Sequence, residues 1–142
     1  MTRFGRQDSQ FQLPTFAGKT ISELFAYGEV NSAETVEIII VKLDDDHLWH
    51  RFFLDAGIGF YSECMTKDDA LDGYKVSMET DYTSKWKLKG KTINSARCIG
   101  TQLNQPELSQ FVFMLDNEII TLKYSDQNDM DSETILLLSS KL

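Results

Sequence analysis

The feature that most constrains this chain is a short motif that occurs twice. Gly-Lys-Thr-Ile stands at residues 18–21 and again at 90–93, an offset of 72 (90 minus 18). At the same offset and without gaps, Gly28 falls on Gly100, and Leu43-Asp44 falls on Leu115-Asp116. A repeat of this kind governs the architecture, because each copy folds as one supersecondary unit. We therefore predict an internal repeat, with copies at residues 16–52 and 88–124.

The motif resembles the end of a phosphate-binding loop, but the rest of that loop is missing. A phosphate loop needs a further glycine five residues before the Gly-Lys pair, because that glycine shapes the turn around the phosphates. Leu13 and Lys85 stand at these two positions. Neither copy is therefore expected to bind a nucleotide, and we expect no cofactor.

Each copy continues into an apolar run, an acidic turn and a second apolar run. In the first copy Asp44, Asp45 and Asp46 separate VEIIIVKL from HLWHRFFL. In the second copy the turn is Asp116-Asn117, two residues that tolerate the positive φ of a tight hairpin. Both stretches read as β-hairpins.

The segments between and after the copies also favour strands. Residues 85–91 alternate, which predicts a strand with Trp86 and Leu88 on one face and the four lysines on the other. Alternation likewise predicts a strand over 74–82, with Tyr74, Val76 and Met78 on one face, and GIGFYSEC predicts another. Two alternatives stay open, since residues 20–27 and the ETILLLSS segment each suit a strand or a short helix. MTKDDALDGY suits a polar turn or a single helical turn.

The fold class that follows is mainly β with little helix, an antiparallel β-sandwich or strongly curved sheet, with two hairpin units. The 142 residues suit a single domain, 1–142, preceded by a flexible N-terminus at 1–12. The start has no signal-peptide pattern, and the longest aliphatic run, Ile38–Val41, is too short to span a membrane. Two cysteines make no disulfide framework, so we expect a cytoplasmic protein.

The net charge of −8 disfavours nucleic acid as a partner, because phosphate backbones repel an acidic domain. The lysine row at 85–91 does not reverse this expectation, because alternation places Trp86 on the opposite face. Charge complementarity instead points to a basic protein partner.

No catalytic or metal-binding set emerges from the remaining polar residues. His47 and His50 are three apart, so on a strand they point to opposite faces. The acidic segment at 126–133 lacks the glycine of a calcium loop, and no nucleophile motif accompanies the aspartates at 44–46. Cys64 has no evident base beside it. We therefore expect no catalytic residues and no metal, and favour a protein that is not an enzyme.

Both copies share a pattern: an apolar residue is followed by x-Gly-Lys-x-Ile and later by an apolar run that ends in Leu-Asp. In this pattern the chain resembles small bacterial proteins that are similar to immunity proteins of polymorphic or contact-dependent toxin systems. This resemblance implies a non-enzymatic inhibitor that neutralises one basic cognate toxin. An alternative is a small enzyme or ligand-binding β-barrel that uses His47 or His50 with nearby carboxylates. Monomer and homodimer both stay open. The residues expected to bind the partner are Asp44, Asp45, Asp46, Asp126, Asp129, Asp131 and Glu133.

Overall fold

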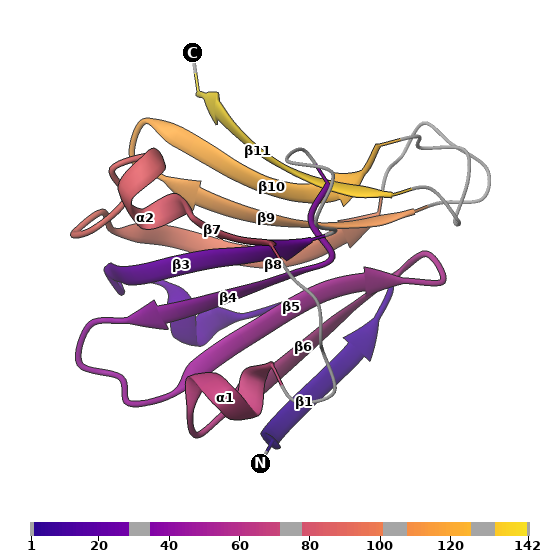
Figure 1. The fold of residues 1–142 in the computed structure, drawn as a ribbon. Coiled ribbons are helices and arrows are strands. Elements are labelled where there is room, and N and C mark those ends of the chain that lie inside the picture. Colours follow the sequence, from indigo (N-terminus) through magenta and orange to yellow (C-terminus); the bar gives the residue numbers. More distant parts are fainter. Residues whose placement is uncertain (1, 29–34, 72–77, 101–107, 126–132, 142) are drawn as a thin grey trace.

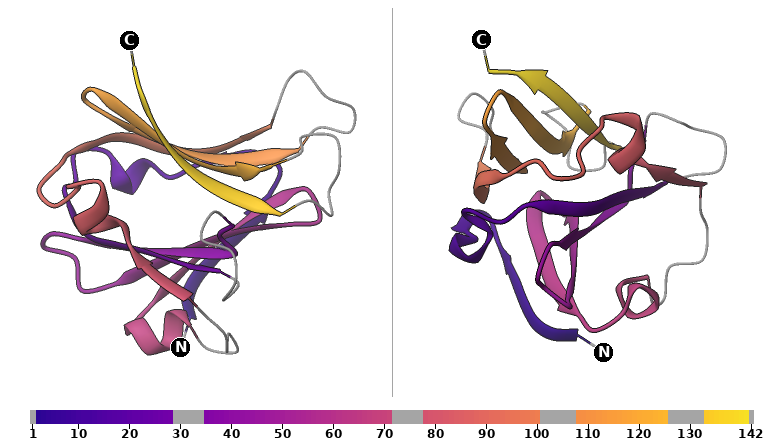
Figure 2. Two further views of the ribbon diagram at one scale, coloured as in Figure 1. Left: turned by 45° about the horizontal axis from the view of Figure 1, so that its top comes forward. Right: turned by 90° about the vertical axis from the view of Figure 1, so that its left-hand side faces the viewer.

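The chain folds into two antiparallel β-sheets packed face to face, and the sheets do not close into a barrel (Figures 1 and 2). The structure is a computed structural model that describes residues 2–28, 35–71, 78–100, 108–125 and 133–141. The prediction of a mainly β, sandwich-like fold with little helix is confirmed.

Six strands form the first sheet, here called sheet A. In spatial order they are β1 (Thr2–Asp8), β6 (Ile58–Cys64), β5 (Trp49–Asp55), β4 (Ile38–Leu43), β3 (Ile21–Gly28) and β7 (Met78–Asp81). Five strands form sheet B, which lies above sheet A in Figure 1. In spatial order they are β11 (Thr134–Ser140), β10 (Glu118–Tyr124), β9 (Ser109–Leu115), β8 (Ile93–Gly100) and β2 (Phe11–Gln12). Three helical turns complete the described elements: η1 (Pro14–Phe16), α1 (Lys67–Ala70) and α2 (Tyr82–Lys85).

The main core fills the space between the sheets, because alternate residues of each strand point inward. On β5, for example, His50, Phe52 and Leu54 are buried while their neighbours are half-buried or exposed. Aromatic rings dominate the centre, where Phe52 packs edge-on against Phe111 and Phe113 with centroids 5.1 Å apart.

The two Gly-Lys-Thr-Ile motifs lie side by side and pair with each other. The Gly18 amide donates to the Ile93 carbonyl (2.8 Å), and the Gly90 amide donates to the Ile21 carbonyl (2.9 Å). The two isoleucine amides donate in turn to the lysine carbonyl of the opposite motif, at 2.9 and 2.8 Å. Both glycines have positive φ, 82° and 86°, which favours glycine there. The four bonds form two equivalent pairs, so an approximate two-fold axis passes between the motifs.

Strand pairing follows the same correspondence. Leu24 pairs with Val41 in the β3–β4 hairpin, and Ala96 pairs with Phe113 in the β8–β9 hairpin, each partner 72 residues further on. The order β7-β3-β4-β5-β6 in sheet A therefore matches β2-β8-β9-β10-β11 in sheet B, and β1 is additional. The correspondence is one of pairing and order, and the internal repeat itself stays a prediction.

The segments with two open alternatives are strands, since residues 21–28 form β3 and residues 134–140 form β11. Residues 67–70 form the single helical turn α1. Residues 2–8, expected to be flexible, instead form β1, which pairs along β6. The predicted strand face of Tyr74 and Val76 lies outside the described residues, and β7 begins at Met78.

The predicted lysine-rich strand at 85–91 is wrong. Asp81 caps a helical turn by accepting the Ser84 amide (3.3 Å), and Lys87 then takes a positive φ of 54°. Leu88 is buried as expected, but Trp86 is only half-buried, against Tyr82. The alternating segment therefore forms a capped helical turn followed by a second turn. The Asp81 side chain bonds to a nearby backbone amide, and such a local hydrogen bond favours a turn over a strand.

The predicted positive φ at Asp116-Asn117 is also wrong. The non-glycine residues with positive φ within the described ranges are Asp45, Ala56 and Lys87, so of the two predicted hairpins it is the first, at Asp45, that contains such a residue. In the part of the chain that the structure describes, no helix has the length and apolar character needed to cross a membrane.

Candidate functional site

The acidic loop between β4 and β5, residues 44–48, forms the candidate site. Asp44 and Asp45 are exposed, and Asp45 has a φ of 64°, in the region that Asp tolerates better than most residues. The Thr20 hydroxyl donates to the Asp44 carboxylate over 2.7 Å, so the second half of the first Gly-Lys-Thr-Ile motif holds one side of the loop.

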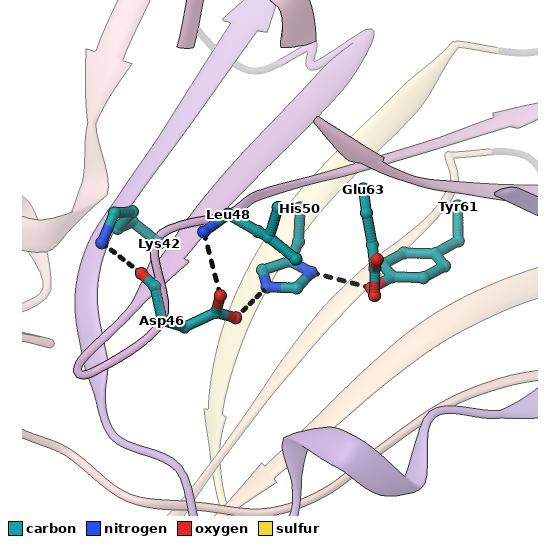
Figure 3. A network of polar contacts seen from close by, with 6 residues as sticks. All are labelled: Lys42, Asp46, Leu48, His50, Tyr61 and Glu63. Atoms are coloured by element: carbon teal, nitrogen blue, oxygen red, sulfur yellow. Dashed lines mark hydrogen bonds and ion pairs between the residues drawn. The ribbon is translucent and has the colours of Figure 1, made fainter. Parts of the chain in front are cut away.

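Asp46 turns inward and anchors the loop from within (Figure 3). Its carboxylate accepts the Leu48 amide (2.9 Å) and lies 2.7 Å from Nε2 of His50. Its main-chain carbonyl accepts a hydrogen bond from the Lys42 ammonium. Burial alone would raise the pKa of Asp46, but the Leu48 amide and His50 together hold it below its usual value. Asp46 is therefore held as a charged group beneath the loop.

His50 continues this chain of polar contacts into the core. Its ring is 3% exposed, and its Nδ1 lies 2.7 Å from the Tyr61 hydroxyl, which lies 3.4 Å from a Glu63 carboxylate oxygen. Figure 3 shows the ring between Asp46 and Tyr61. The Phe16 ring packs against it edge-on, with centroids 4.8 Å apart. We call Asp46, His50, Tyr61 and Glu63 the polar chain.

Strand register brings the polar chain together. A two-residue turn, Ala56-Gly57, joins β5 to β6, and both residues have positive φ, 52° and 84°, as a type I′ turn requires. This turn fixes the register that places His50 opposite Glu63. Tyr61 lies on the same face two residues from Glu63. Burial and the neighbouring Glu63 raise the pKa of Tyr61, so its hydroxyl keeps its proton.

The polar chain has two proton arrangements. With a neutral ring that donates from Nε2 to Asp46, Nδ1 accepts the Tyr61 proton, and Glu63 then receives none from Tyr61. With protons on both ring nitrogens, Nδ1 donates to Tyr61 and the hydroxyl donates to Glu63. The two arrangements differ at the far end of the chain, where the Tyr61 hydroxyl donates to Glu63 only when it accepts from Nδ1 of His50.

Sheet B fills the positions equivalent to those of the polar chain with apolar residues. Val41 pairs with His50, whereas its counterpart Phe113 pairs with Ile120. The register then places Leu136 and Leu138 where sheet A has Tyr61 and Glu63. Three apolar residues thus occupy the positions that equivalent strand pairing gives to the polar residues. A buried polar group that the architecture does not require is a candidate for a functional role.

The corresponding end of sheet B is hollow. A depression of about 660 Å³ is lined by the second Gly-Lys-Thr segment, the β9–β10 turn and the end of β11. Lys91 and Glu118 line it and form an ion pair with each other. Asp116 also lines the depression, so its lining carries one carboxylate more than it has cations, whereas the loop of sheet A carries three aspartates.

The predicted partner-binding residues that the structure describes do not form one surface. Asp44 and Asp45 lie together on the loop that follows β4, and Asp46 faces inward. Glu133 is exposed, but it precedes Thr134, which contacts Val36 before the start of β4. Glu133 and the loop are therefore at opposite ends of β4. Asp126, Asp129 and Asp131 lie outside the described residues.

The two histidines do not act as a pair, since His47 is exposed on the loop and His50 is buried. Within the described ranges, no three His, Cys, Asp or Glu side chains gather in a way that suits a metal ion. Cys64 and Cys98 are buried, and burial raises the pKa of Cys98 to about 11, which keeps its thiol protonated and unreactive.

Tyr61 and Glu63 are the site residues that the sequence prediction missed. A signal for them exists in the sequence, because the Asp55-Ala56-Gly57-Ile58 stretch favours a tight hairpin. Counting outward from that turn places His50 opposite Glu63.

The chain matches no protein-family model, no curated protein and no solved structure.

Proposed function

We propose that this chain is a non-enzymatic binding protein that holds a basic partner protein at the β4–β5 loop. One observation carries the proposal: Asp44 and Asp45 present exposed carboxylates on a loop that Asp46 anchors from within. The loop combines negative charge on its outer side with fixed geometry on its inner side.

Fixed geometry matters because ordering a loop on binding costs conformational entropy. Four contacts hold this loop before any partner arrives: Thr20 to Asp44, Lys42 to the Asp46 carbonyl, and the Leu48 amide and His50 to the Asp46 carboxylate. A loop already held in one conformation loses less entropy when it binds. The polar chain thus serves as the support of the binding loop.

The charge of the loop sets the chemistry of the partner. Lysine and arginine side chains complement exposed carboxylates, and a chain with a net charge of −8 steers a basic protein toward it. Acidic loops on a rigid β scaffold are a common way to present such a surface.

The resemblance to immunity proteins supports a narrower form of the proposal. In that form the chain is a bacterial, cytoplasmic inhibitor, and its partner is the basic toxin domain of a polymorphic or contact-dependent system. An inhibitor of this class binds its toxin and catalyses nothing. A rigid charged loop above a closed core suits that role.

The alternative of a small enzyme that uses His50 receives less support. Asp46 and Tyr61 occupy both ring nitrogens, and Phe16 covers the ring, so a substrate has no direct route to His50. His47 is exposed but belongs to the same loop as the carboxylates. The ligand-binding barrel also receives less support, since the two sheets stay open.

The test begins by capturing the partner from the native host with the immobilised chain and then measuring association kinetics with the purified partner. We expect Asp44→Asn/Asp45→Asn to slow association by roughly three- to tenfold, because the carboxylates steer encounter. Association of the unaltered chain should slow as salt rises, because ions screen exposed charges beyond about 8 Å at physiological ionic strength.

A matched control removes two carboxylates from the opposite end of β5. Asp8→Asn/Asp55→Asn makes the same charge change near the β5–β6 turn, since Asp8 pairs with Gly59 and Asp55 ends β5. This variant should associate nearly as fast as the unaltered chain. Equal rates for the two double variants, or association that is insensitive to salt, would remove the loop from the proposed interface.

A further inference from the structure

One short segment of this acidic chain is strongly basic. Residues 85–91 contain four lysines and no acidic residue, in a chain whose net charge is −8. Three of these lysines are exposed, and so is the lysine of the first Gly-Lys-Thr-Ile motif. We call these four exposed side chains, Lys19, Lys85, Lys87 and Lys89, the lysine patch. Within the described ranges, no carboxylate forms an ion pair with the lysine patch.

The lysine patch and the β4–β5 loop lie on the two sides of the start of β3. On one side, the Asp44 amide donates to the Thr20 carbonyl (3.0 Å). On the other side, Ile21 accepts from the Gly90 amide and donates to the Lys91 carbonyl, both over 2.9 Å. Adjacent strands are about 4.8 Å apart, so the two flanking backbones are separated by roughly 10 Å. Opposite charges therefore lie side by side at one end of the molecule, at the left in Figure 1.

We propose that two copies of this chain dimerise through this end, with the β4–β5 loop of each copy on the lysine patch of the other. Two adjacent segments of opposite charge are self-complementary, because a two-fold axis that passes midway between them brings each segment onto the opposite one. The exposed aspartates of one copy, Asp44 and Asp45, then meet the lysines of the second copy. The same contacts form a second time with the two copies exchanged.

Charge complementarity favours a second copy as the occupant of this surface. A basic protein complements the loop alone, and an acidic protein complements the lysine patch alone. A second copy presents both charges, in the order that the two-fold axis requires. The net charge of −8 on each copy opposes association, but at physiological ionic strength repulsion over more than about 8 Å is screened, and contacts at the interface are screened less.

The segment that carries the lysine patch also contains an aromatic ring. Trp86 lies between Lys85 and Lys87, and its ring is half-buried against Tyr82, with centroids 4.3 Å apart. An exposed ion pair alone contributes little to affinity, because solvent weakens the attraction. The exposed part of the Trp86 ring adds apolar area, and tryptophan among polar residues is enriched where interfaces are strongest.

The dimer and a basic partner compete for the same carboxylates. Dimerisation uses the charge of the β4–β5 loop, but it does not depend on the function proposed for that loop. In the dimer the second copy covers Asp44 and Asp45. A basic partner that binds the loop must therefore displace the second copy.

The test reverses the charges of the two segments. Asp44→Lys/Asp45→Lys places lysine opposite lysine, and Lys87→Glu/Lys89→Glu places carboxylate opposite carboxylate. Each variant alone should dimerise more weakly than the unaltered chain by about tenfold or more, because like charges at contact oppose association. An equimolar mixture of the two variants should dimerise again, because each contact then joins a lysine to a carboxylate.

Sedimentation velocity over a concentration series measures the dimerisation of each variant, of their mixture and of the unaltered chain. Circular dichroism shows that each variant is folded. The side chains exchanged are exposed, and lysine already occurs in this chain at a φ of 54°, at Lys87, close to the 64° of Asp45.

Matched controls make the same charge changes away from this end. Arg6→Glu/Lys123→Glu alters β1 and the far end of β10, and Asp8→Lys/Asp55→Lys alters residues next to the β5–β6 turn. Each control has the net charge of the variant that it matches, so repulsion between whole molecules is the same. Each control should dimerise more strongly than its variant. Equal weakening by variant and control would show that net charge, not this contact, sets the dimerisation.

Carbodiimide cross-linking gives a second measurement that needs no variant. The reagent joins a lysine amine to a carboxylate in contact with it. In a mixture of isotope-labelled and unlabelled chains, mass spectrometry should find links between a loop of one isotope and a lysine patch of the other.

A chain that stays monomeric at millimolar concentration and gives no such links would overturn the proposal. A mixture of folded variants that fails to dimerise would also overturn it, and so would capture of an acidic protein by the lysine patch of a monomeric chain. None of these results bears on the basic partner, whose association is measured separately with Asp44→Asn/Asp45→Asn.

Discussion

Where β5 carries His50, the equivalent strand of the other sheet, β10, carries Ile120. The strand beside β5 contributes Tyr61 and Glu63, and the strand beside β10 contributes Leu136 and Leu138. The surrounding pairing is equivalent, but one sheet fills these positions with hydrogen-bonding groups and the other with aliphatic groups. An apolar set is stabilised by burial alone, whereas a polar set must find a partner for each buried atom.

The difference extends to the hairpin loops. In sheet A five residues, 44–48, connect β4 to β5, and in sheet B two residues, 116–117, connect β9 to β10. The longer loop brings the Asp46 carboxylate back to the His50 ring, so the carboxylate is the hydrogen-bond partner of the buried Nε2. Core chemistry and loop geometry are therefore coupled in sheet A, and the comparison gives three ways to test that coupling.

The largest effect should come from the aromatic residue that covers the polar chain. Phe16 is fully buried and contacts the rings of His50, Phe52 and Tyr61. Phe16→Ala should lower the free energy of unfolding by roughly 3–5 kcal/mol, through lost burial and an unfilled cavity. Urea denaturation measures this value. The equivalent residue beside the second motif is Leu88, also fully buried, and Leu88→Ala should cost roughly 2–5 kcal/mol, less than Phe16→Ala.

A loss below about 1 kcal/mol for Phe16→Ala would contradict the burial seen between the sheets. A larger loss for Leu88→Ala than for Phe16→Ala would mean that sheet B, not the aromatic cluster over sheet A, dominates the stability of the core.

A smaller effect should follow from breaking the polar chain, and replacing it should restore stability. Tyr61→Phe leaves Nδ1 of His50 without its partner, so the free energy of unfolding should fall by about 1–3 kcal/mol. The triple variant His50→Ile/Tyr61→Leu/Glu63→Leu installs the residues of sheet B. It should cost less than Tyr61→Leu alone, which makes the same loss of volume at residue 61 but leaves Nδ1 of His50 buried without a partner.

Denaturant unfolding of both variants decides this point. If the triple variant were less stable than Tyr61→Leu, the polar chain would be needed for the fold of sheet A, and the equivalence with sheet B would fail. If the triple variant is stable, its association rate with the partner, compared with that of the unaltered chain, measures how much the polar chain positions the loop.

The smallest effect should appear in acid. The pKa of Asp46 is lower in the folded chain than in the unfolded chain, so its charged form stabilises the fold at neutral pH. That contribution is present above about pH 4, the pKa of aspartate in an unfolded chain, and is lost as the pH falls further. Stability measured from pH 7 to pH 2 should therefore decline less steeply below pH 4 in Asp46→Asn.

Asp116→Asn, in the turn of sheet B, controls for the loss of one carboxylate. Asp116 is exposed and accepts a hydrogen bond from Asn94 (3.1 Å). An acid profile of Asp46→Asn that matches the unaltered chain would show that the loop is not anchored through this carboxylate.

The sequence predicted the elements whose signals are local. Apolar runs on either side of an acidic turn identified both hairpins, because a polar turn between two apolar runs favours antiparallel pairing. The exposed position of Asp44 and Asp45 on a hairpin loop also followed from their place between two strands. The lysine-rich segment failed because two local signals competed, and the Asp81 cap outweighed the alternation.

The sequence by itself determined that this chain is a mainly β protein with two similar hairpins and a strongly acidic surface. Only the tertiary structure decided that the two Gly-Lys-Thr-Ile motifs pair with each other, that Asp46 turns inward, and that the Asp46 carboxylate and the Tyr61 hydroxyl both reach the His50 ring. Those contacts depend on strand register and on the approach of the two sheets. Pairing between distant residues is set by the packing of the whole core, which no local pattern encodes.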